Sequence, residues 1–283
     1  MAEPGPRAIV IGAGTMGIGI AAALLSADFA VTVIEPDDAN RDSTRGLVRS
    51  ILDESERRGK LDQGGAEAVA ARLALAGALS ANDLGPELIV EAVPESSRLK
   101  RQVLVEAEAV RPAILASNTS SLSIDGLAEA LSDAQAFVGL HFFNPVAAMP
   151  LVEVVRSKAT SDATVASALE LVHRLGKEPI VVRDAPGFAS SRLGLALGLE
   201  AIRMVEERVA EPTAIDRAME LGYRHPIGPL RLTDLVGLDV RLDIATHLAH
   251  ELGPRFEPPR LLEEMVADGR LGRKSGQGFY HWE

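Results

Sequence analysis

One histidine of this sequence stands where it could act as a general base. Of the six histidines, His141 alone ends a predicted sheet strand, at 137–141, and Glu153 follows twelve residues later in the apolar run 151–155. An unperturbed histidine has a pKa of about 6.5, close to the working pH of most enzymes. A buried acid needs a partner, and if the two strands bring these side chains together, Glu153 orients the ring as in catalytic triads. The alternative is that Glu153 meets water at a strand edge.

The remaining histidines favour simpler interpretations. His247 and His250 lie three residues apart in a predicted helix and could share a metal, but no third ligand is apparent, so no metal site is expected. The motifs G-x-S-x-G and H-E-x-x-H are absent, which leaves hydrolase chemistry without a nucleophile or a metal. Proton transfer by His141 is therefore the predicted chemistry.

A glycine-rich turn follows the first predicted strand. The run Arg7–Ile11 leads into Gly12-Ala13-Gly14-Thr15-Met16-Gly17 and then into an apolar helix pattern. In the dinucleotide motif the first glycine allows the turn, the second lets backbone approach the pyrophosphate, and the third packs the helix on the strand. The helix N-terminus offers N–H groups to the phosphates. Strand, motif and helix together predict a dinucleotide site.

The acid at the end of the next strand predicts which dinucleotide binds. The run Val31–Ile34 is followed by Glu35, about 20 residues beyond the glycines, where a carboxylate binds the ribose 2′-hydroxyl. The same carboxylate repels a 2′-phosphate, and Pro36 rather than arginine follows it. A glycine-rich turn of another α/β protein is the alternative, but strand, helix and acid together favour NAD.

Apolar runs alternate with helix-like segments up to about residue 185. Further strands are expected at 73–76, 88–92, 114–117, 137–141, 151–155 and 178–182, and helices at about 37–58, 96–110, 123–131 and 162–175. This alternation predicts an α/β, Rossmann-type, mostly parallel sheet with helices on both faces. Polar clusters follow three of the strands, at 91–95, 117–122 and 141–145, where ligands of such sheets bind.

The chain changes character after residue 185. Helices are expected at 193–209, from 211, at 230–252 and at 259–268, and the next strand pattern is 278–282. We therefore expect a Rossmann domain over residues 1–185 and an all-helical C-terminal domain over 186–283. Helices this apolar in a domain of about 100 residues indicate surface buried against a second subunit, so a homodimer is expected.

Composition excludes several classes of partner and chemistry. The net charge of −11 argues against nucleic acid. No apolar stretch reaches the about 18 residues that span a bilayer, and residues 1–6 lack the basic start of a signal peptide, so no membrane association is expected. The absence of cysteine excludes disulfides and thiolate catalysis and fits a cytoplasmic protein.

The predicted helix 37–58 carries basic side chains on one face. Arg41, Arg45 and Arg49 are spaced by four residues, and residues 41–60 hold six basic and four acidic side chains. This local excess could attract an anionic substrate tail such as a nucleotide phosphate. A solvated helix face explains the same pattern, and both interpretations stay open at this point.

Six further segments, taken in chain order, carry a family resemblance. They are Glu91-Ala-Val-Pro-Glu95, Ser117-Asn-Thr-Ser-Ser-Leu122, Gly139-Leu-His-Phe-Phe-Asn-Pro145, Leu151-Val-Glu-Val-Val155, Pro186-Gly-Phe188 and Gly276-Gln-Gly-Phe-Tyr280. With residues 12–17 they resemble short-chain L-3-hydroxyacyl-CoA dehydrogenases, including the 3-hydroxybutyryl-CoA dehydrogenases. The resemblance implies reversible NAD-dependent oxidation of an L-3-hydroxyacyl-CoA to the 3-ketoacyl-CoA, a step of fatty-acid β-oxidation.

The resemblance also implies roles for individual residues. It makes His141 the catalytic base and Glu153 its orienting partner. The other residues that it implies are Ser120 and Asn144 for the substrate oxygen and the nicotinamide, Glu35, Glu95, Lys100 and Lys274 for the NAD site, and Ser50 and Arg57 for the CoA tail.

One position departs from the family pattern. Where the family has a substrate-facing Asn after Pro-Gly-Phe, this chain has Ser191, whose shorter side chain leaves room for a water. The departure leaves the acyl chain length open. Two other functions stay open: dehydrogenation of a non-CoA 3-hydroxy acid, as in the gulonate dehydrogenase relatives, and non-catalytic NAD binding.

Overall fold

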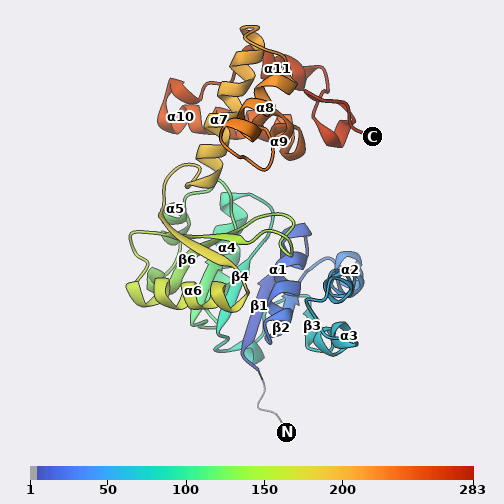
Figure 1. Cartoon of the computed structure of the whole chain (residues 1–283). Helices are drawn as coiled ribbons and strands as arrows, with labels where there is room; N and C mark the ends of the chain where they lie inside the picture. Colours follow the sequence, from blue (N-terminus) through green and yellow to red (C-terminus); the bar gives the residue numbers. More distant parts are fainter. Residues whose placement is uncertain (1–4) are drawn as a thin grey trace. The chain divides into compact units, whose positions relative to one another are not determined.

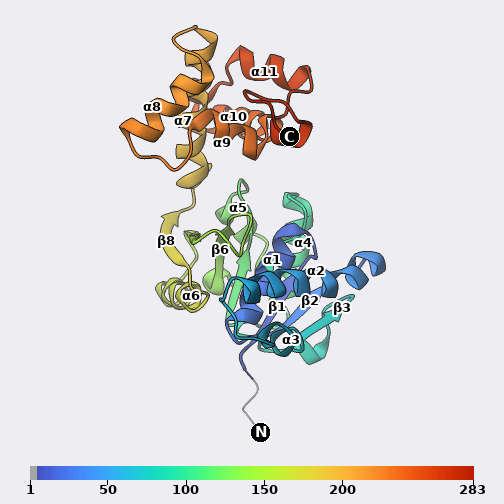
Figure 2. The ribbon, with the colours of Figure 1, turned by 45° about the vertical axis from the view of Figure 1, so that its right-hand side comes forward.

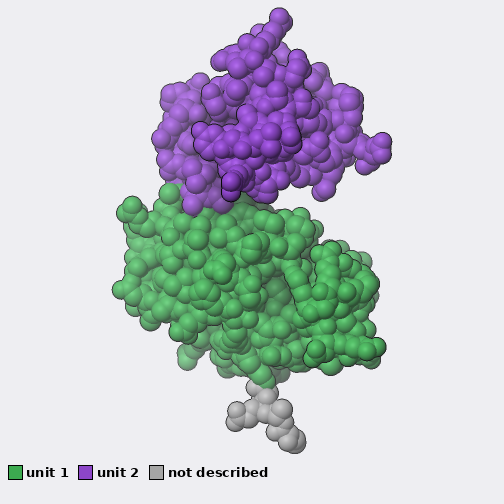
Figure 3. All heavy atoms as spheres, in the orientation of Figure 1, with its two compact units in different colours: residues 1–185 green, residues 186–283 purple. Residues whose placement is uncertain are grey.

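The computed structural model describes residues 5–283, and the chain divides into two compact units, residues 1–185 and 186–283 (Figure 3). The expectation about a signal peptide concerns residues 1–6, and residues 1–4 lie outside the described part. Within residues 5–283, none of the helices has both the length and the apolar composition that crossing a bilayer demands.

The first unit is built on an eight-stranded sheet with helices packed beside it (Figure 1). The strand order is β3-β2-β1-β4-β5-β6-β7-β8. All pairs among β1 to β6 are parallel, whereas β7 runs antiparallel to β6 and parallel to β8. The strands are β1 (Arg7–Ile11), β2 (Ala30–Ile34), β3 (Leu73–Ala76), β4 (Leu88–Glu91), β5 (Ile114–Ser117), β6 (Phe137–Phe142), β7 (Leu151–Arg156) and β8 (Glu178–Arg183). The predicted fold class is confirmed.

Side-chain caps determine where several helices of this unit begin. The oxygens of Asp37, Ser96 and Ser161 accept hydrogen bonds from backbone N–H groups in the first turns of α2, α4 and α6. The sequence did not predict the short helix α3. The helices are α1 (Thr15–Ser26), α2 (Asp38–Arg57), α3 (Gly65–Ala70), α4 (Ser97–Glu108), α5 (Ile124–Ala128) and α6 (Asp162–Arg174).

The antiparallel pairing of β6 with β7 brings two chemical groups together. All six residues of β6 are buried, and in the ladder His141 lies directly opposite Glu153. Directly opposed residues of an antiparallel pair point to the same face of the sheet with Cβ atoms about 5 Å apart. The fold thereby makes a pair from residues twelve positions apart.

The second unit is helical and has its own apolar core. Its helices are α7 (Ser190–Glu206), α8 (Pro212–Gly222), α9 (Pro229–Val236), α10 (Leu238–Leu252) and α11 (Arg260–Ala267) (Figure 2). The prediction of one helix over 230–252 is wrong. Gly237 adopts a φ of +105°, outside the helical region, and separates α9 from α10.

The strand pattern at 278–282 forms no strand either, because a buried carboxylate takes its hydrogen-bond donors. Asp234 accepts from the backbone N–H groups of Phe279 and Tyr280 and from the indole N–H of Trp282. Only isolated bridges form there, from Gln277 to Gly272 and to His281.

Candidate functional site

A buried histidine–carboxylate pair lies at the carboxyl end of β6. Nδ1 of His141 is 2.7 Å from Oε2 of Glu153, and Glu153 is fully buried. An ionised Glu153 accepts a hydrogen bond from Nδ1–H, which fixes the ring tautomer. The ring also packs against Phe143 with 4.4 Å between centroids. This arrangement suits a base that takes a proton through Nε2.

The segments that follow β4 and β5 form a network around Glu95. Its carboxylate accepts hydrogen bonds from Thr119 Oγ1, from Ser121 Oγ at 3.0 Å and from the backbone N–H of Ser120 at 3.2 Å. Burial raises the pKa of Glu95, but these hydrogen bonds and the charge of Lys100 outweigh it, so the pKa lies below the ordinary value. These hydrogen bonds fix the loop that carries Ser120 against Glu95.

Lys100 reaches the same network from α4 and is fully buried. Its ammonium lies 2.7 Å from Glu91 and 3.4 Å from Glu95 and donates to the carbonyls of Val93 and Asn118. Lys100 therefore joins the segments that follow β4 and β5. A fully buried lysine needs such partners because an unpaired buried charge is costly.

A cavity of about 810 Å³ opens beside the glycine motif. Gly12, Ala13, Gly14, Thr15 and Met16 line it. A Cβ at position 14 would meet nothing within 4 Å, so backbone borders open space there, whereas a Cβ at position 17 would lie 1.9 Å from the carbonyl oxygen of Gly12. The motif therefore leaves room for a pyrophosphate and closes the turn against the helix, and these residues fit a dinucleotide.

Glu35 lines this cavity at the end of β2. Its two carboxylate oxygens accept hydrogen bonds from the backbone N–H groups of Ala13, at 3.0 Å, and Asp37, at 3.1 Å. These bonds orient the carboxylate at the rim of the cavity and leave acceptor capacity for a hydroxyl group, since a carboxylate accepts about four hydrogen bonds.

One wall of the cavity is formed by residues that the sequence did not identify as part of a site. One face of α4 supplies part of the lining, and the segment after β3 supplies more: Leu99, Gln102, Val103 and Glu106, then Gly77, Ala78 and Leu79. The four residues of α4 are spaced as residues on one face of a helix, and this spacing can be recognised in the sequence. The sequence does not show that this face borders a cavity.

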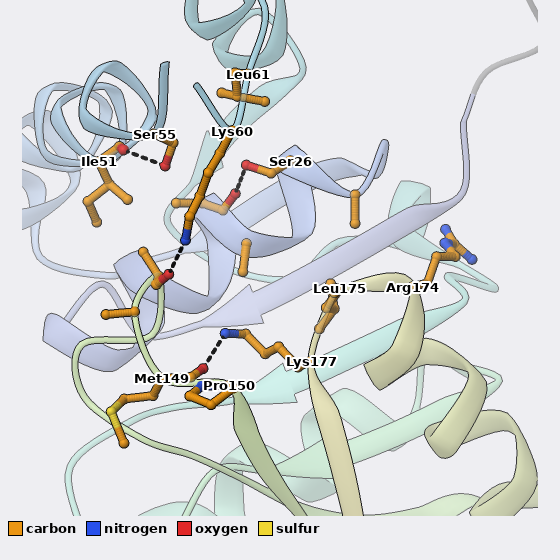
Figure 4. A pocket seen from close by; sticks show the side chains of 16 residues that line it. Ser26, Ile51, Ser55, Lys60, Leu61, Met149, Pro150, Arg174, Leu175 and Lys177 are labelled. Carbon is orange, nitrogen blue, oxygen red and sulfur yellow. Dashed lines mark hydrogen bonds between the residues drawn. The ribbon is translucent and has the colours of Figure 1, made fainter. Parts of the chain in front are cut away.

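A second cavity, of about 470 Å³, lies between α1, the end of α2 and the segment before β7 (Figure 4). Nζ of Lys177 donates to the carbonyls of Val146 and Met149, and Nζ of Lys60 donates to the carbonyl of Ala147. Burial, together with the nearby charge of Lys60, lowers the pKa of Lys177. Two lysines therefore anchor the segment 143–150, which follows His141 and carries Asn144.

The same segment packs on α1 at a glycine. A Cβ at Gly19 would lie 2.8 Å from Cγ2 of Val146, a contact that forces the segment or the helix to move. We expect Gly19→Ala to lower the free energy of unfolding by about 1–3 kcal/mol, the usual cost of overpacking, and to lower turnover by shifting Asn144. Urea unfolding and steady-state kinetics measure the two effects.

The control is Gly46→Ala in α2, where an added Cβ meets nothing within 4 Å. Alanine favours the helix over glycine by up to about 1 kcal/mol at both positions. At position 46 no clash opposes this gain, so Gly46→Ala should raise the free energy of unfolding. Equal effects of the two variants on stability would contradict the packing argument.

The basic side chains of α2 mostly have partners within the first unit. Arg49 pairs with Asp53, and Arg57 with Glu54. Ser50 and Arg57 are exposed and seven residues apart, so they lie on one face of the helix. That face is open to solvent, and both residues stay candidates for an anionic substrate tail.

Two of the expected site residues belong to the second unit. Ser191 lies in the first turn of α7, and Lys274 pairs with Asp239. The first unit brings together His141, Glu153 and the loops that carry Ser120 and Asn144, next to the strand ends that border the larger cavity.

Comparisons with known proteins agree over the whole chain. Residues 7–185 match the 3-hydroxyacyl-CoA dehydrogenase NAD-binding domain, and residues 187–282 match the C-terminal domain of the same family. The chain is similar to 3-hydroxybutyryl-CoA dehydrogenase of Mycobacterium tuberculosis, at 40% identity over 99% of each chain. It is also similar to the crystal structure of (S)-3-hydroxybutyryl-CoA dehydrogenase PaaH1 from Ralstonia eutropha, with 39% identity, 99% coverage of both chains and a TM-score of 0.92. A diketoreductase structure matches with 26% identity, 98% and 99% coverage and a TM-score of 0.87.

Proposed function

Because the chain belongs to the 3-hydroxyacyl-CoA dehydrogenase family, we propose that it catalyses the reversible oxidation of a short-chain L-3-hydroxyacyl-CoA, such as 3-hydroxybutyryl-CoA, to the 3-ketoacyl-CoA. The enzyme is an NAD-dependent oxidoreductase of this family. The observation that supports the proposal best is the buried contact between His141 and Glu153 at the carboxyl end of β6.

The proposed mechanism assigns proton transfer to this pair. NAD, when bound, supplies the hydride acceptor at its nicotinamide ring. His141 takes the proton of the 3-hydroxyl group through Nε2, and Glu153 stabilises the charged ring through Nδ1–H. Ser120, Asn144 and Ser191 hold the substrate oxygen while it becomes a carbonyl.

The strand order supports a short distance between the proposed cofactor site and His141. The larger cavity borders the segment after β4, and β6 is two strands away, which is about 10 Å at the usual strand spacing. The residues proposed to hold NAD are Gly12, Ala13, Gly14, Thr15, Met16, Gly17, Glu35, Glu95, Lys100, Ser120, Asn144 and Lys274.

Glu35 is proposed to determine cofactor choice. We expect Glu35→Ala to weaken NADH binding and to narrow the preference for NADH over NADPH by about tenfold or more, since one ribose hydrogen bond to a charged group and one phosphate repulsion are lost. The ratio of kcat/KM for the two cofactors measures this. Glu106→Ala, on the α4 wall of the same cavity, is the control for a lost acid, and an unchanged ratio in Glu35→Ala would refute the ribose role.

Two further assignments belong to this proposal. Ser50 and Arg57 lie near the CoA tail, on the exposed face of α2. The second unit forms a homodimer, which its exposed apolar side chains support: Leu193, Val209, Leu221 and Tyr223. Light scattering of the purified protein tests the dimer.

NADH oxidation with acetoacetyl-CoA, run beside free acetoacetate, tests the function as a whole. Rapid turnover with the thioester alone supports the proposal. Turnover with acetoacetate as well would favour a non-CoA 3-hydroxy acid as the substrate. The similarity to a diketoreductase is the observation in favour of this second function. No turnover with either compound, despite measured NADH binding, would contradict dehydrogenation.

A further inference from the structure

The side chain of Asn118 continues the sheet past the end of β5. β5 pairs with β6 as far as Ser117 and Gly139, whereas β6 runs on beside β7 to Phe142. Where β5 has ended, the backbone N–H of Phe142 donates to Oδ1 of Asn118 at 3.0 Å. Backbone N–H groups inside a protein need an acceptor, and here a side-chain oxygen replaces the carbonyl that a longer β5 would supply.

The backbone of Asn118 is itself held from two sides. Its N–H donates to the carbonyl of Glu91 at 2.8 Å, and its carbonyl accepts from Nζ of Lys100 at 3.1 Å. Lys100 is fully buried and also contacts the carboxylates of Glu91 and Glu95. The hydrogen bond from Asn118 to Phe142 is therefore anchored in the buried network that follows β4 and β5.

This hydrogen bond acts on the peptide group next to the proposed base. The N–H of Phe142 belongs to the peptide bond that follows His141, and Glu153 of β7 contacts the His141 ring. The end of β6 is thus held by β7 on one side and by Asn118 on the other. Two residues after Asn118 comes Ser120, whose N–H is bound by Glu95. Asn118 therefore links the strand that carries His141 to the loop that carries Ser120.

We propose that Asn118 is a positioning residue for the reaction: its side-chain amide fixes the carboxyl end of β6 so that His141 and Ser120 meet the same substrate oxygen. The inference rests on the proposed function, since it concerns the residues assigned there to proton transfer and to oxygen binding. A displacement of about 1 Å at a reacting group can lower the rate by about 100-fold. A purely structural role of the same bond predicts lower stability with an unchanged kcat per folded molecule.

The first variant is Asn118→Leu, which keeps the size of the side chain and removes the acceptor. We expect kcat with acetoacetyl-CoA and NADH to fall by about 10–100-fold. NADH affinity should stay nearly unchanged, because Asn118 does not line the cavity proposed to hold the cofactor. Fluorescence titration counts the NADH-binding sites, and kcat expressed per site excludes unfolded protein. Should the leucine variant not fold, Asn118→Ala removes the same acceptor without added apolar bulk.

The matched control is Thr160→Val, at the other end of the same strand. Oγ1 of Thr160 donates to the carbonyl of Phe137 at 2.7 Å, so this variant also removes a side-chain hydrogen bond to β6, but far along the strand from His141. It should lower the urea midpoint, as Asn118→Leu does, and leave kcat per NADH-binding site unchanged.

The rescue variant is Asn118→Asp, which keeps an oxygen acceptor at the same place. Its kcat should exceed that of Asn118→Leu, and NMR should show the Phe142 amide exchanging faster than in the wild type only in the leucine variant. The inference fails if kcat of Asn118→Leu equals that of Thr160→Val, or if the aspartate and leucine variants lose equal activity. In both cases wild-type turnover leaves the proposed function standing, whereas absence of wild-type turnover would overturn that function itself.

Discussion

Replacing His141 by glutamine is expected to lower kcat by about 10²–10⁴-fold while NADH affinity stays nearly intact. Glutamine keeps a polar side chain of similar size but cannot take up a proton. His141 does not line the cavity proposed to hold the cofactor, so the affinity for NADH should not change. Steady-state kinetics with acetoacetyl-CoA, together with NADH fluorescence titration, separates the two quantities.

The matched control is His247→Gln, an exposed histidine of α10, which should leave kcat unchanged. A companion variant, Glu153→Gln, keeps the imidazole but removes the charge that stabilises it, so turnover should also fall. Normal turnover in His141→Gln would disprove its role as the base.

Replacing Lys100 by methionine is expected to lower the free energy of unfolding by about 3–5 kcal/mol, because it leaves the fully buried carboxylate of Glu91 without its cation. The loops after β4 and β5 also lose the link that Lys100 makes between them. Urea unfolding measures the loss of stability.

The neighbouring Arg101→Met is the control, since Arg101 pairs with Glu129 at the surface and such pairs contribute about 0–1 kcal/mol. Adding Glu91→Gln to Lys100→Met should restore part of the stability, because the uncompensated charge is then gone. If Lys100→Met lowered the free energy of unfolding by less than Arg101→Met does, the buried pair of Lys100 and Glu91 would contribute little to stability.

Much of the first unit was predictable because its signals are local. The strand before the glycine motif, the acid after β2 and the polar clusters at strand ends all follow from short stretches of sequence. The strand at 151–155 was also predicted, but its direction was not, because nothing local in β7 distinguishes antiparallel from parallel pairing.

The features that the sequence did not predict depend on packing between distant segments. Lysine is a residue type that usually lies at the surface, and only the fold shows that the segments after β4 and β5 enclose Lys100. The pattern of residues 230–252 is continuous enough for one helix, yet Gly237 breaks it. Asp234 draws the C-terminal segment out of a strand, and no periodicity in residues 278–282 indicates that.

The pairing of β6 with β7 also limits how this region can be exchanged between proteins. Side chains alternate faces along a strand, so sliding β7 by one residue would turn Glu153 away from His141. The connecting segment 143–150 is held at three carbonyls and at Val146, so it has little slack to absorb an insertion. A chimera in which the connecting segment differs in length would shift this register, so residues 137–156 are best grafted as one block.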